Sequence, residues 1–372
     1  MLENGQMIPV SRPSVGPLEL EYVTRAVESS WIGSTGDFLD RLRCEFAQEV
    51  GTKYAIPVTN GTVALHLALL AVGVSSGDEV IVPSLTYIAP VNAVRYCGAT
   101  PVFADVEKES WCIDPNQITQ LITPKTKAII AVHLYGMPAT MNKIIEIGRK
   151  YGLYVIEDAA EAMFAKYGNT MTGNLGDIST FSLFGNKVLT SGEGGIITTN
   201  DEKIASEIEI LRGQGMDPNR RYWFPKIGFN YRMTNVAAAI FCAQFERREE
   251  LQEKRWAVYN IYDGVFSTCK EIQIQVNLQD RTRSPWLYPV IIGKECKRNR
   301  EQVMSDLHSK LIETRPFFTP IHELPPYKIF KPKLSMKVTN SLARAGFNLP
   351  TFPDLPLSQV HKIAKSLVES VS

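Results

Sequence analysis

The chain has 372 residues, of which 44% are hydrophobic and 21% are charged, as in ordinary globular proteins. Lysine and arginine number 40 against 39 aspartates and glutamates, and this balance excludes the globally basic surface that collects nucleic acid or anionic membrane. No apolar run approaches the about 18 residues of a membrane span, and the first residues do not resemble a signal peptide. The six cysteines form no CxxC pair, which favours free thiols and a cytoplasmic location.

Strand-like and helix-like segments alternate over the first part of the chain. The expected strands are 54–58, 79–83, 100–105, 127–133 and 154–157, and the expected helices are 62–72, 88–96, 114–121 and 141–151. Apolar strands separated by helices of about ten residues indicate a mostly parallel sheet covered on both faces. This α/β pattern places ligands at the carboxyl ends of the strands.

The pattern changes after about residue 236. The later segments are expected to be a charge-rich helical stretch at 236–262, a strand at 286–292, proline-rich turns at 316–326, and helices at 300–311 and 357–371. We therefore expect a large domain over residues 1–245 and a smaller α+β domain over residues 246–372. We also expect the N-terminal segment, up to about residue 25, to pack against the smaller domain.

The first candidate site segment is Asn60-Gly61-Thr62, between an expected strand and an expected helix. A glycine and a small hydroxyl residue at a helix N-terminus offer free backbone N–H groups and the positive end of the helix dipole, which suits a phosphate. The alternative is a simple N-cap, and the segment alone favours that alternative.

The second segment, Tyr154–Glu161, is an apolar strand followed by carboxylates. A carboxylate buried at Asp158 needs a cation, because burying an unpaired charge is costly. A protonated heteroaromatic nitrogen is one such cation. A metal is another, but the five histidines are scattered along the chain, so we expect no metal. An N-cap role for Asp158 before a following helix explains the segment equally well.

In the third segment, a β-like run leads through Ser182 to Lys187 in a glycine-containing turn. A lysine that follows apolar residues can be desolvated, and desolvation lowers its pKa toward that of a nucleophilic amine. The alternative is a surface lysine with its ammonium in water. Glycines at 192, 194 and 195 follow and indicate a tight turn before a strand.

Together, these segments supply a phosphate site, an acid for a ring nitrogen and an activated amine. Pyridoxal 5′-phosphate requires these three groups. Tyr87 falls just beyond the expected strand at 79–83, where its ring can stack on the cofactor.

At these segments the sequence resembles the DegT/DnrJ/EryC1/StrS family of nucleotide-sugar aminotransferases, over about residues 9–370. The family's phosphate, aspartate and lysine segments appear as NGTVALHLAL, VIEDAAEA and FSLFGNKVLTSGEGG, and the runs GFNYRMTN and RPFFTPIH are also typical. The resemblance implies a fold-type I, aspartate-aminotransferase-like α/β architecture, with a large domain around a mostly parallel sheet and a smaller α+β C-terminal domain. It also implies transamination with pyridoxal 5′-phosphate, by way of pyridoxamine phosphate.

The resemblance implies roles for individual residues as well. Lys187 would bond to the cofactor, Asp158 would pair with its ring nitrogen, and Glu161 would lie near the ring and its phenolic oxygen. The remaining contacts to the cofactor would come from Asn60, Gly61, Thr62, Ser182 and Tyr87.

Three further residues concern the substrate and a partner. In this family Asn230 reaches the phosphate of the neighbouring subunit, so the resemblance implies a homodimer with a shared active site, or a tetramer of two such dimers. Arg315 and His322 would lie near the sugar nucleotide.

A cationic and aromatic cluster is formed by Arg220, Arg221, Tyr222 and Trp223. Such a cluster is able to bind a diphosphate and to cover a base or sugar. The alternative is a solvated basic turn.

Within the family, the segments at 84–102 and 212–235 are most similar to the branch that aminates GDP-4-keto-6-deoxy-D-mannose at C4 for O-antigen or other surface polysaccharide. The donor would be L-glutamate, leaving as 2-oxoglutarate, and Lys187 favours this reaction over the dehydration catalysed by members with histidine there. The alternative is a UDP- or dTDP-linked keto sugar, aminated at C3 or C4. Met163, Phe164 and Leu183 depart from the residues common in the family and bear on pocket shape.

Other classes of protein fit less well. A nicotinamide-dependent oxidoreductase would carry GxGxxG at the first strand–helix turn, and this sequence does not. A non-catalytic protein that keeps the fold is disfavoured because Lys187 and Asp158 are both retained.

Overall fold

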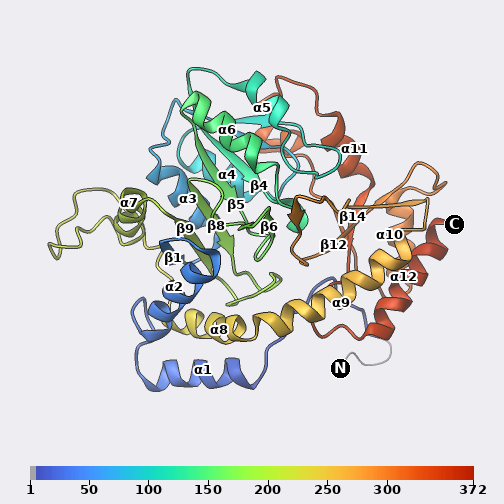
Figure 1. The fold of residues 1–372 in the computed structure, drawn as a ribbon, viewed down its shortest axis with the longest axis horizontal. Coiled ribbons are helices and arrows are strands. Elements are labelled where there is room, and N and C mark those ends of the chain that lie inside the picture. The colour runs from blue at the N-terminus through green and yellow to red at the C-terminus, as the bar shows by residue number, and fades with distance from the viewer. Residues whose placement is uncertain (1–5) are drawn as a thin grey trace.

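A seven-stranded sheet forms the centre of the larger part of the molecule in the computed structural model, which describes residues 6–372 (Figure 1). Its strands, in spatial order, are β1 (Tyr54–Val58), β9 (Gly195–Thr199), β8 (Ile178–Ser182), β5 (Tyr154–Asp158), β4 (Thr126–Val132), β2 (Glu79–Pro83) and β3 (Thr100–Ala104). The run from β8 to β3 is parallel, whereas β9 is antiparallel to both β8 and β1. The expected mostly parallel sheet is confirmed, with β9 as an exception that periodicity did not reveal.

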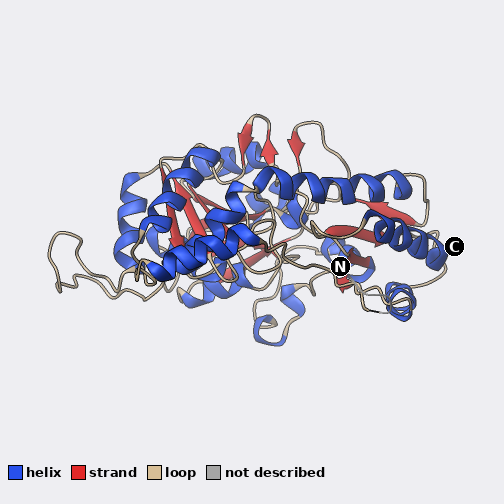
Figure 2. Cartoon of the chain, turned by 90° about the horizontal axis from the view of Figure 1, so that it is seen from below, coloured by secondary structure: helices blue, strands red, loops and turns tan. Residues whose placement is uncertain are grey.

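The connecting helices cover both faces of this sheet (Figure 2). They are α2 (Asp37–Val50), α3 (Gly61–Ala71), α4 (Ala89–Tyr96), α5 (Pro115–Leu121), α6 (Met141–Tyr151) and α7 (Glu202–Arg212). Every strand and helix expected between residues 54 and 158 begins and ends within one residue of the observed element. Helix α3 is apolar on nearly all sides because it packs against β8, β9, α4 and α7.

A four-stranded antiparallel sheet organises the C-terminal part. Its strands, in spatial order, are β10 (Ile272–Ile274), β12 (Tyr288–Ile292), β14 (Gly346–Leu349) and β13 (Arg315–Pro316). The helices of this part are α9 (Arg248–Phe266), α10 (Arg300–Ser309), α11 (Lys337–Ala345) and α12 (Leu357–Val371). Aromatic and aliphatic side chains from α9, α12, β12 and β14 form one buried cluster.

The helical stretch expected at 236–262 is confirmed, and it divides into two helices, α8 (Asn235–Glu246) and α9, which meet at Arg247. The backbone of Arg247 has φ −91° and ψ 10°, and its guanidinium is held by Glu19 at 2.8 Å and by Glu250 at 3.1 Å. The predicted domain division at residue 245 falls in the last turn of α8 and stays a prediction.

The N-terminal segment divides between the two parts of the molecule. Ile8 exchanges backbone hydrogen bonds with Leu311 and Glu313, and the carbonyl of Val10 accepts from Thr351, so these residues contact the C-terminal part as expected. Helix α1 (Pro17–Glu28), which the sequence analysis did not identify, packs instead along α8 (Figure 1).

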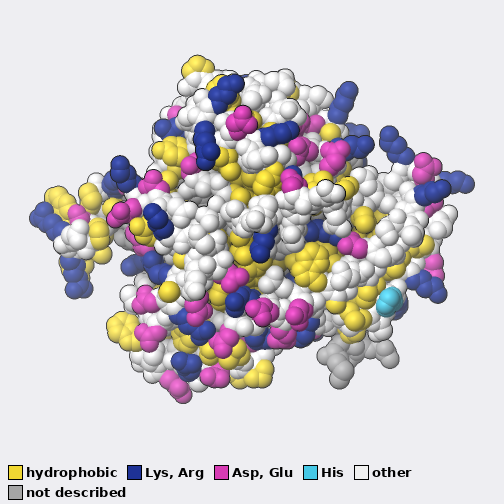
Figure 3. Space-filling view, viewed as in Figure 1, with side chains coloured by type: hydrophobic (Ala, Val, Ile, Leu, Met, Phe, Trp, Pro, Cys, Tyr) yellow, Lys and Arg dark blue, Asp and Glu magenta, His cyan; other side chains and the backbone are white. Residues whose placement is uncertain are grey.

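Short elements complete the described part of the chain. They are β6 (Lys166–Tyr167), β7 (Thr170–Met171), β11 (Arg281–Thr282) and the 3-10 turns Leu134–Gly136, Ile321–Glu323 and Pro325–Tyr327. Among residues 6–372, no helix has both the length and the apolarity needed to cross a membrane. On the face shown in Figure 3, acidic and basic side chains are interspersed, in keeping with the near-neutral net charge.

Candidate active site

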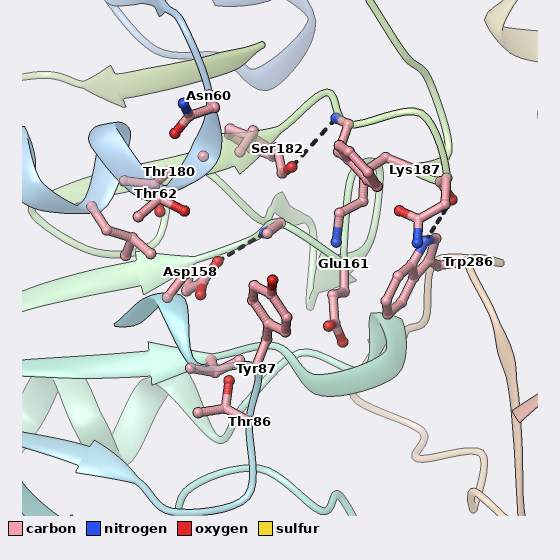
Figure 4. Close-up of a pocket in the computed structure, with 18 of the residues that line it drawn as sticks. Asn60, Thr62, Thr86, Tyr87, Asp158, Glu161, Thr180, Ser182, Lys187 and Trp286 are labelled. Atoms are coloured by element: carbon pink, nitrogen blue, oxygen red, sulfur yellow. Dashed lines mark hydrogen bonds between the residues drawn. The ribbon is translucent and has the colours of Figure 1, made fainter. Parts of the chain in front are cut away.

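A cavity of about 770 Å³ opens at the carboxyl ends of β5 and β8 and is closed on its other side by residues of β13 and β14. In Figure 4 the side chains of Asp158, Glu161, Lys187 and Trp286 converge on one space. Nine of the residues predicted for the site line this cavity: Asn60, Gly61, Thr62, Tyr87, Asp158, Glu161, Ser182, Lys187 and Arg315.

The N-terminus of α3 forms one end of the cavity. The side chain of Asn60 accepts from the backbone N–H of Val63 at 3.0 Å, so the N-cap alternative holds for this side chain. Helix α3 lies very close to β8 and β9, since a Cβ at Gly61 would be 2.9 Å from the Cβ of Ser182. A Cβ at Gly195 would be 2.6 Å from the carbonyl carbon of Asn60. The glycines therefore create a narrow cradle between the helix N-terminus and the end of β8.

Asp158 ends β5 and is only 6% exposed. One carboxylate oxygen accepts from the backbone N–H of Ala160 at 3.1 Å. Burial raises the pKa of Asp158, while that hydrogen bond and the charge of Lys187 lower it. The residues that follow form turns and not a helix, so the helix N-cap alternative for Asp158 is wrong. A buried carboxylate with so few partners favours a cationic ligand.

Lys187 follows β8 in a turn closed by its own N–H, which donates to the carbonyl of Phe184 at 2.9 Å. Its side chain is only partly exposed and points into the cavity, so the surface-lysine alternative is wrong (Figure 4). Desolvation lowers the pKa of its amine, although the charges of Glu161 and Asp158 act in the opposite direction. A lowered pKa increases the fraction of neutral, nucleophilic amine.

Two further carboxylates near Asp158 have different environments. Glu161 lines the cavity, accepts from the backbone N–H of Tyr135 at 2.7 Å, and has its pKa raised by burial to about 7. Glu157 points to the opposite face of the sheet. There it accepts from Ser179 at 2.6 Å, from His133 at 3.0 Å and from three backbone N–H groups, and these bonds outweigh burial and lower its pKa. Glu157 therefore stabilises the fold behind the site.

The structure does not bring every predicted site residue to this cavity. His322 lies outside it, where its Nδ1 is 2.7 Å from the hydroxyl of Ser84. The other four residues lie on a loop between α7 and α8, which we call the arm (residues 213–230) and which extends away from the sheet (Figure 1). They are Arg220, Arg221, Tyr222 and Asn230, all exposed and all absent from this chain's own cavity wall.

Sequence reasoning missed several of the residues that line the cavity, which together we call its wall. Trp286, Phe318 and Asn348 come from the C-terminal part, and Tyr135 comes from the 3-10 turn Leu134–Gly136. Tyr135 has φ 51°, a left-handed conformation that is costly for a bulky residue and that clusters at functional sites. Phe318 lies within the RPFFTPIH run that is typical of the family, whereas Trp286 and Tyr135 were marked only by their aromatic character at or beside the expected strands 286–292 and 127–133. Nothing in the sequence marked Asn348.

Comparisons with known proteins agree with this fold and site. Residues 13–368 match the model of the DegT/DnrJ/EryC1/StrS aminotransferase family. A protein of Caulobacter vibrioides named GDP-perosamine synthase is 45% identical over 97% of each chain, and one of Escherichia coli O157:H7 with the same name is 44% identical over 98% of this chain and 99% of its own. A solved structure, described as the PLP-form of the putative sugar aminotransferase Spr1654 from Streptococcus pneumoniae, superposes with a TM-score of 0.93 over 98% of each chain at 24% identity.

The mostly parallel sheet, the cavity at its carboxyl edge and the amine inside that cavity define the class as an α/β aminotransferase. The chain belongs to the DegT/DnrJ/EryC1/StrS aminotransferase family. The resemblance inferred from the sequence motifs is thereby confirmed.

Proposed function

We propose that this chain transfers an amino group from L-glutamate to C4 of GDP-4-keto-6-deoxy-D-mannose, giving GDP-perosamine, with pyridoxal 5′-phosphate as cofactor. The substrate assignment rests on 45% and 44% identity, over nearly the whole chain, to two proteins named GDP-perosamine synthase. The proposed reaction class also rests on the buried amine and carboxylates of the cavity.

The residues of the cavity fit pyridoxal 5′-phosphate. The backbone N–H groups at the start of α3, with the hydroxyls of Thr62 and Ser182, would hold the phosphate. Glycine at position 61 supports this role, because a side chain there would collide with Ser182. Asp158 would pair with the ring nitrogen, and the buried, sparsely hydrogen-bonded state of its carboxylate suits a cation.

When bound, pyridoxal 5′-phosphate supplies an aldehyde that bonds to amines and a ring that takes up an electron pair. Lys187 would hold the cofactor through its amine. Once free, the same amine would take a proton from Cα of glutamate and would donate a proton to C4 of the sugar in the second half of the reaction. The lowered pKa of Lys187 supports both tasks. The charge of Asp158 would keep the ring nitrogen protonated throughout.

We propose further that a second copy of the chain completes the site, through Asn230 and the guanidinium groups of Arg220 and Arg221 on the arm. The exposure of the arm supports this, since Tyr222 is 73% and Ile227 is 90% exposed. Apolar side chains in such an exposed loop are suited to burial in an interface. The partner would be a second copy of this chain in a homodimer.

The experiment that tests the substrate is a panel of GDP-, UDP- and dTDP-linked 4-keto and 3-keto sugars, each incubated with glutamate and the purified protein. The expected result is a mass gain corresponding to amination of GDP-4-keto-6-deoxy-D-mannose, with stoichiometric release of 2-oxoglutarate. Amination of UDP- or dTDP-linked sugars alone would overturn the substrate assignment while leaving the reaction class intact.

A further inference from the structure

The amine of Lys187 lies against an aromatic ring. Its Nζ is 4.1 Å from the centre of the Trp286 ring. Glu161 and Asp158 act on the amine through their charges, without a hydrogen bond to it. An ammonium over the face of an indole is attracted by the negative face of the ring, and the attraction grows where water is excluded. The ring of Trp286 is therefore a direct contact of this amine.

Trp286 also holds the backbone beside the lysine. Its indole N–H donates to the carbonyl of Asn186 at 2.8 Å. Arg255, on α9, is 1% exposed and donates to the carbonyls of both Lys187 and Trp286 at 3.1 Å. Two buried side chains from the C-terminal part thus connect to the lysine turn of the seven-stranded sheet.

The Trp286 ring is itself held in place by other rings of the cavity. It stacks on Tyr135 with centres 6.3 Å apart and planes at 17°. Tyr135 stacks in turn on Phe318 at 5.7 Å and 14°, and Phe318 meets Tyr87 edge-on at 5.8 Å. The four rings form a continuous aromatic arc from the amine of Lys187 to the residue expected to cover the cofactor ring (Figure 4 labels both ends, Trp286 and Tyr87).

We propose that Trp286 is a positioning residue for Lys187. Its ring holds the amine within reach of the reacting carbon whenever that amine is free, and its N–H holds the turn that carries the lysine. A lysine side chain has four rotatable bonds, and an unrestrained amine would spend little time in a reactive position. This proposal rests on the proposed function, because it needs Lys187 to be the group that bonds to the cofactor and moves the proton.

The first test measures how fast the full chain, stripped of its cofactor, binds pyridoxal 5′-phosphate. The signal is the absorbance at ~420 nm of the bond between Lys187 and the cofactor. For Trp286→Leu we expect loading to slow about tenfold, because the amine is no longer held. If the ring only stabilised the ammonium charge, its removal would free the neutral amine and loading would become faster. Unchanged or faster loading would therefore overturn the proposal.

The second test measures the single-turnover reaction of the loaded protein with glutamate. For Trp286→Leu we expect the rate at saturating glutamate to fall about tenfold, with the half-saturating concentration of glutamate changed less than about twofold. Trp286→Phe keeps a ring face and loses the N–H donor, so it should recover a rate within about threefold of wild type. Equal losses in the Leu and Phe variants would reject the role of the ring.

Two controls separate the possible failures. Trp256→Leu removes a partly buried indole of α9 that packs edge-on against Tyr259 in the C-terminal cluster, and it should load cofactor at the wild-type rate. Lys187→Ala should form no covalent bond with the cofactor. If Lys187→Ala still forms that bond, the proposed function itself fails. If Lys187→Ala is inert and Trp286→Leu behaves like wild type, only the positioning role fails.

Discussion

The carboxylates that line the cavity are buried by their own chain, whereas the arm extends away from that chain (Figure 1). Asp158 and Glu161, on the wall, are each 6% exposed, and Tyr222 and Ile227, on the arm, are 73% and 90% exposed. The wall therefore has fixed hydrogen bonds and shifted pKa values, as in Glu161. Among the arm residues assigned to the site, Arg220 and Arg221 contact the rings of the neighbouring Trp223 and Tyr222.

This difference separates two kinds of functional residue. A wall residue acts on the cavity of its own chain, and its environment is already built by the fold. In the proposed homodimer, an arm residue would act only where the second chain meets it, so its environment would depend on that partner. A substitution in the wall should therefore inactivate the site of the chain that carries it. A substitution in the arm should leave that chain's own site active when the second chain has an intact arm.

The largest effect is expected for Lys187→Ala. Turnover should fall by about a thousandfold or more, because the variant loses the amine that bonds to the cofactor and moves the proton. The absorbance near ~420 nm of the cofactor–lysine bond should also disappear. Steady-state assays and absorbance spectra of the purified variant provide the measurement. Normal turnover would contradict the assignment of Lys187.

The next largest effect is expected for Asp158→Asn. An amide keeps the shape of the carboxylate but not its charge, so the ring nitrogen would lose its proton and the ring would take up electrons poorly. Both half-reactions should slow about a hundredfold or more, as for other charges placed to stabilise a transition state. Single-turnover rates with glutamate and with the keto sugar measure the two halves separately. A rate near wild type in both would remove Asp158 from this role.

The wall also shows which residues a sequence reveals. Lys187 and Asp158 each follow an apolar strand, and the carboxyl ends of parallel strands meet at one edge of a sheet, so their proximity was predictable. Trp286 was not predictable, because its partners Lys187 and Asn186 are about a hundred residues away and only the packed fold brings them together. The break between α8 and α9 at Arg247 was not predictable for the same reason, because the contact between Arg247 and Glu19 joins residues 228 positions apart in the sequence.

A third prediction concerns the pH dependence of the cofactor-free protein. Burial raises the pKa of Glu161 from 4.5 to about 7. The folded chain therefore binds this proton more tightly than the unfolded chain, so the stabilisation is complete below pH 4.5 and is lost as pH rises through about 7. The free energy of unfolding should fall by up to about 3 kcal/mol across this window on account of Glu161.

Denaturant titrations at about pH 5 and about pH 8 measure this difference, with Glu161→Gln as the matched variant. The amide cannot titrate, so the decrease in stability with rising pH should be smaller in Glu161→Gln than in wild type. An identical decrease in both proteins would show that other groups cause it.

The position of the arm residues relative to the cavity could not be predicted either, but for a different reason from that for Trp286. Asn230 was named from the family motif and assigned to a neighbouring subunit, whereas Arg220 and Arg221 were named from their charge beside aromatic residues, with the cavity that they serve left open. His322 was also named from a motif, yet the fold directs its ring to Ser84. A motif can identify a residue, but the packing around that residue decides where it acts.

The smallest effect is expected in the arm. Arg220→Ala and Arg221→Ala should each raise the KM for the nucleotide sugar about tenfold, because a guanidinium near a diphosphate forms charge-assisted hydrogen bonds. The value of kcat should change less. Lys226→Ala is the matched control, because this arm lysine is already paired with Glu207 and its loss should leave KM unchanged. An unchanged KM in both arginine variants would contradict a role in substrate binding and would support the alternative that these residues form a solvated basic turn.

Mixing two impaired chains distinguishes the arm from the wall directly, when activity is assayed at nucleotide-sugar concentrations well below KM, where both variants are nearly inactive. One chain is Lys187→Ala, and the other combines Arg220→Ala, Arg221→Ala and Asn230→Ala. If the arm serves the partner's cavity, each hybrid dimer has one site with an intact Lys187 and an intact arm. Random reassociation should then restore about a quarter of the wild-type activity, as expected for a two-fold symmetric dimer. If the arm serves its own chain, every site lacks one of the two components, and the mixture should gain nothing over the separate variants.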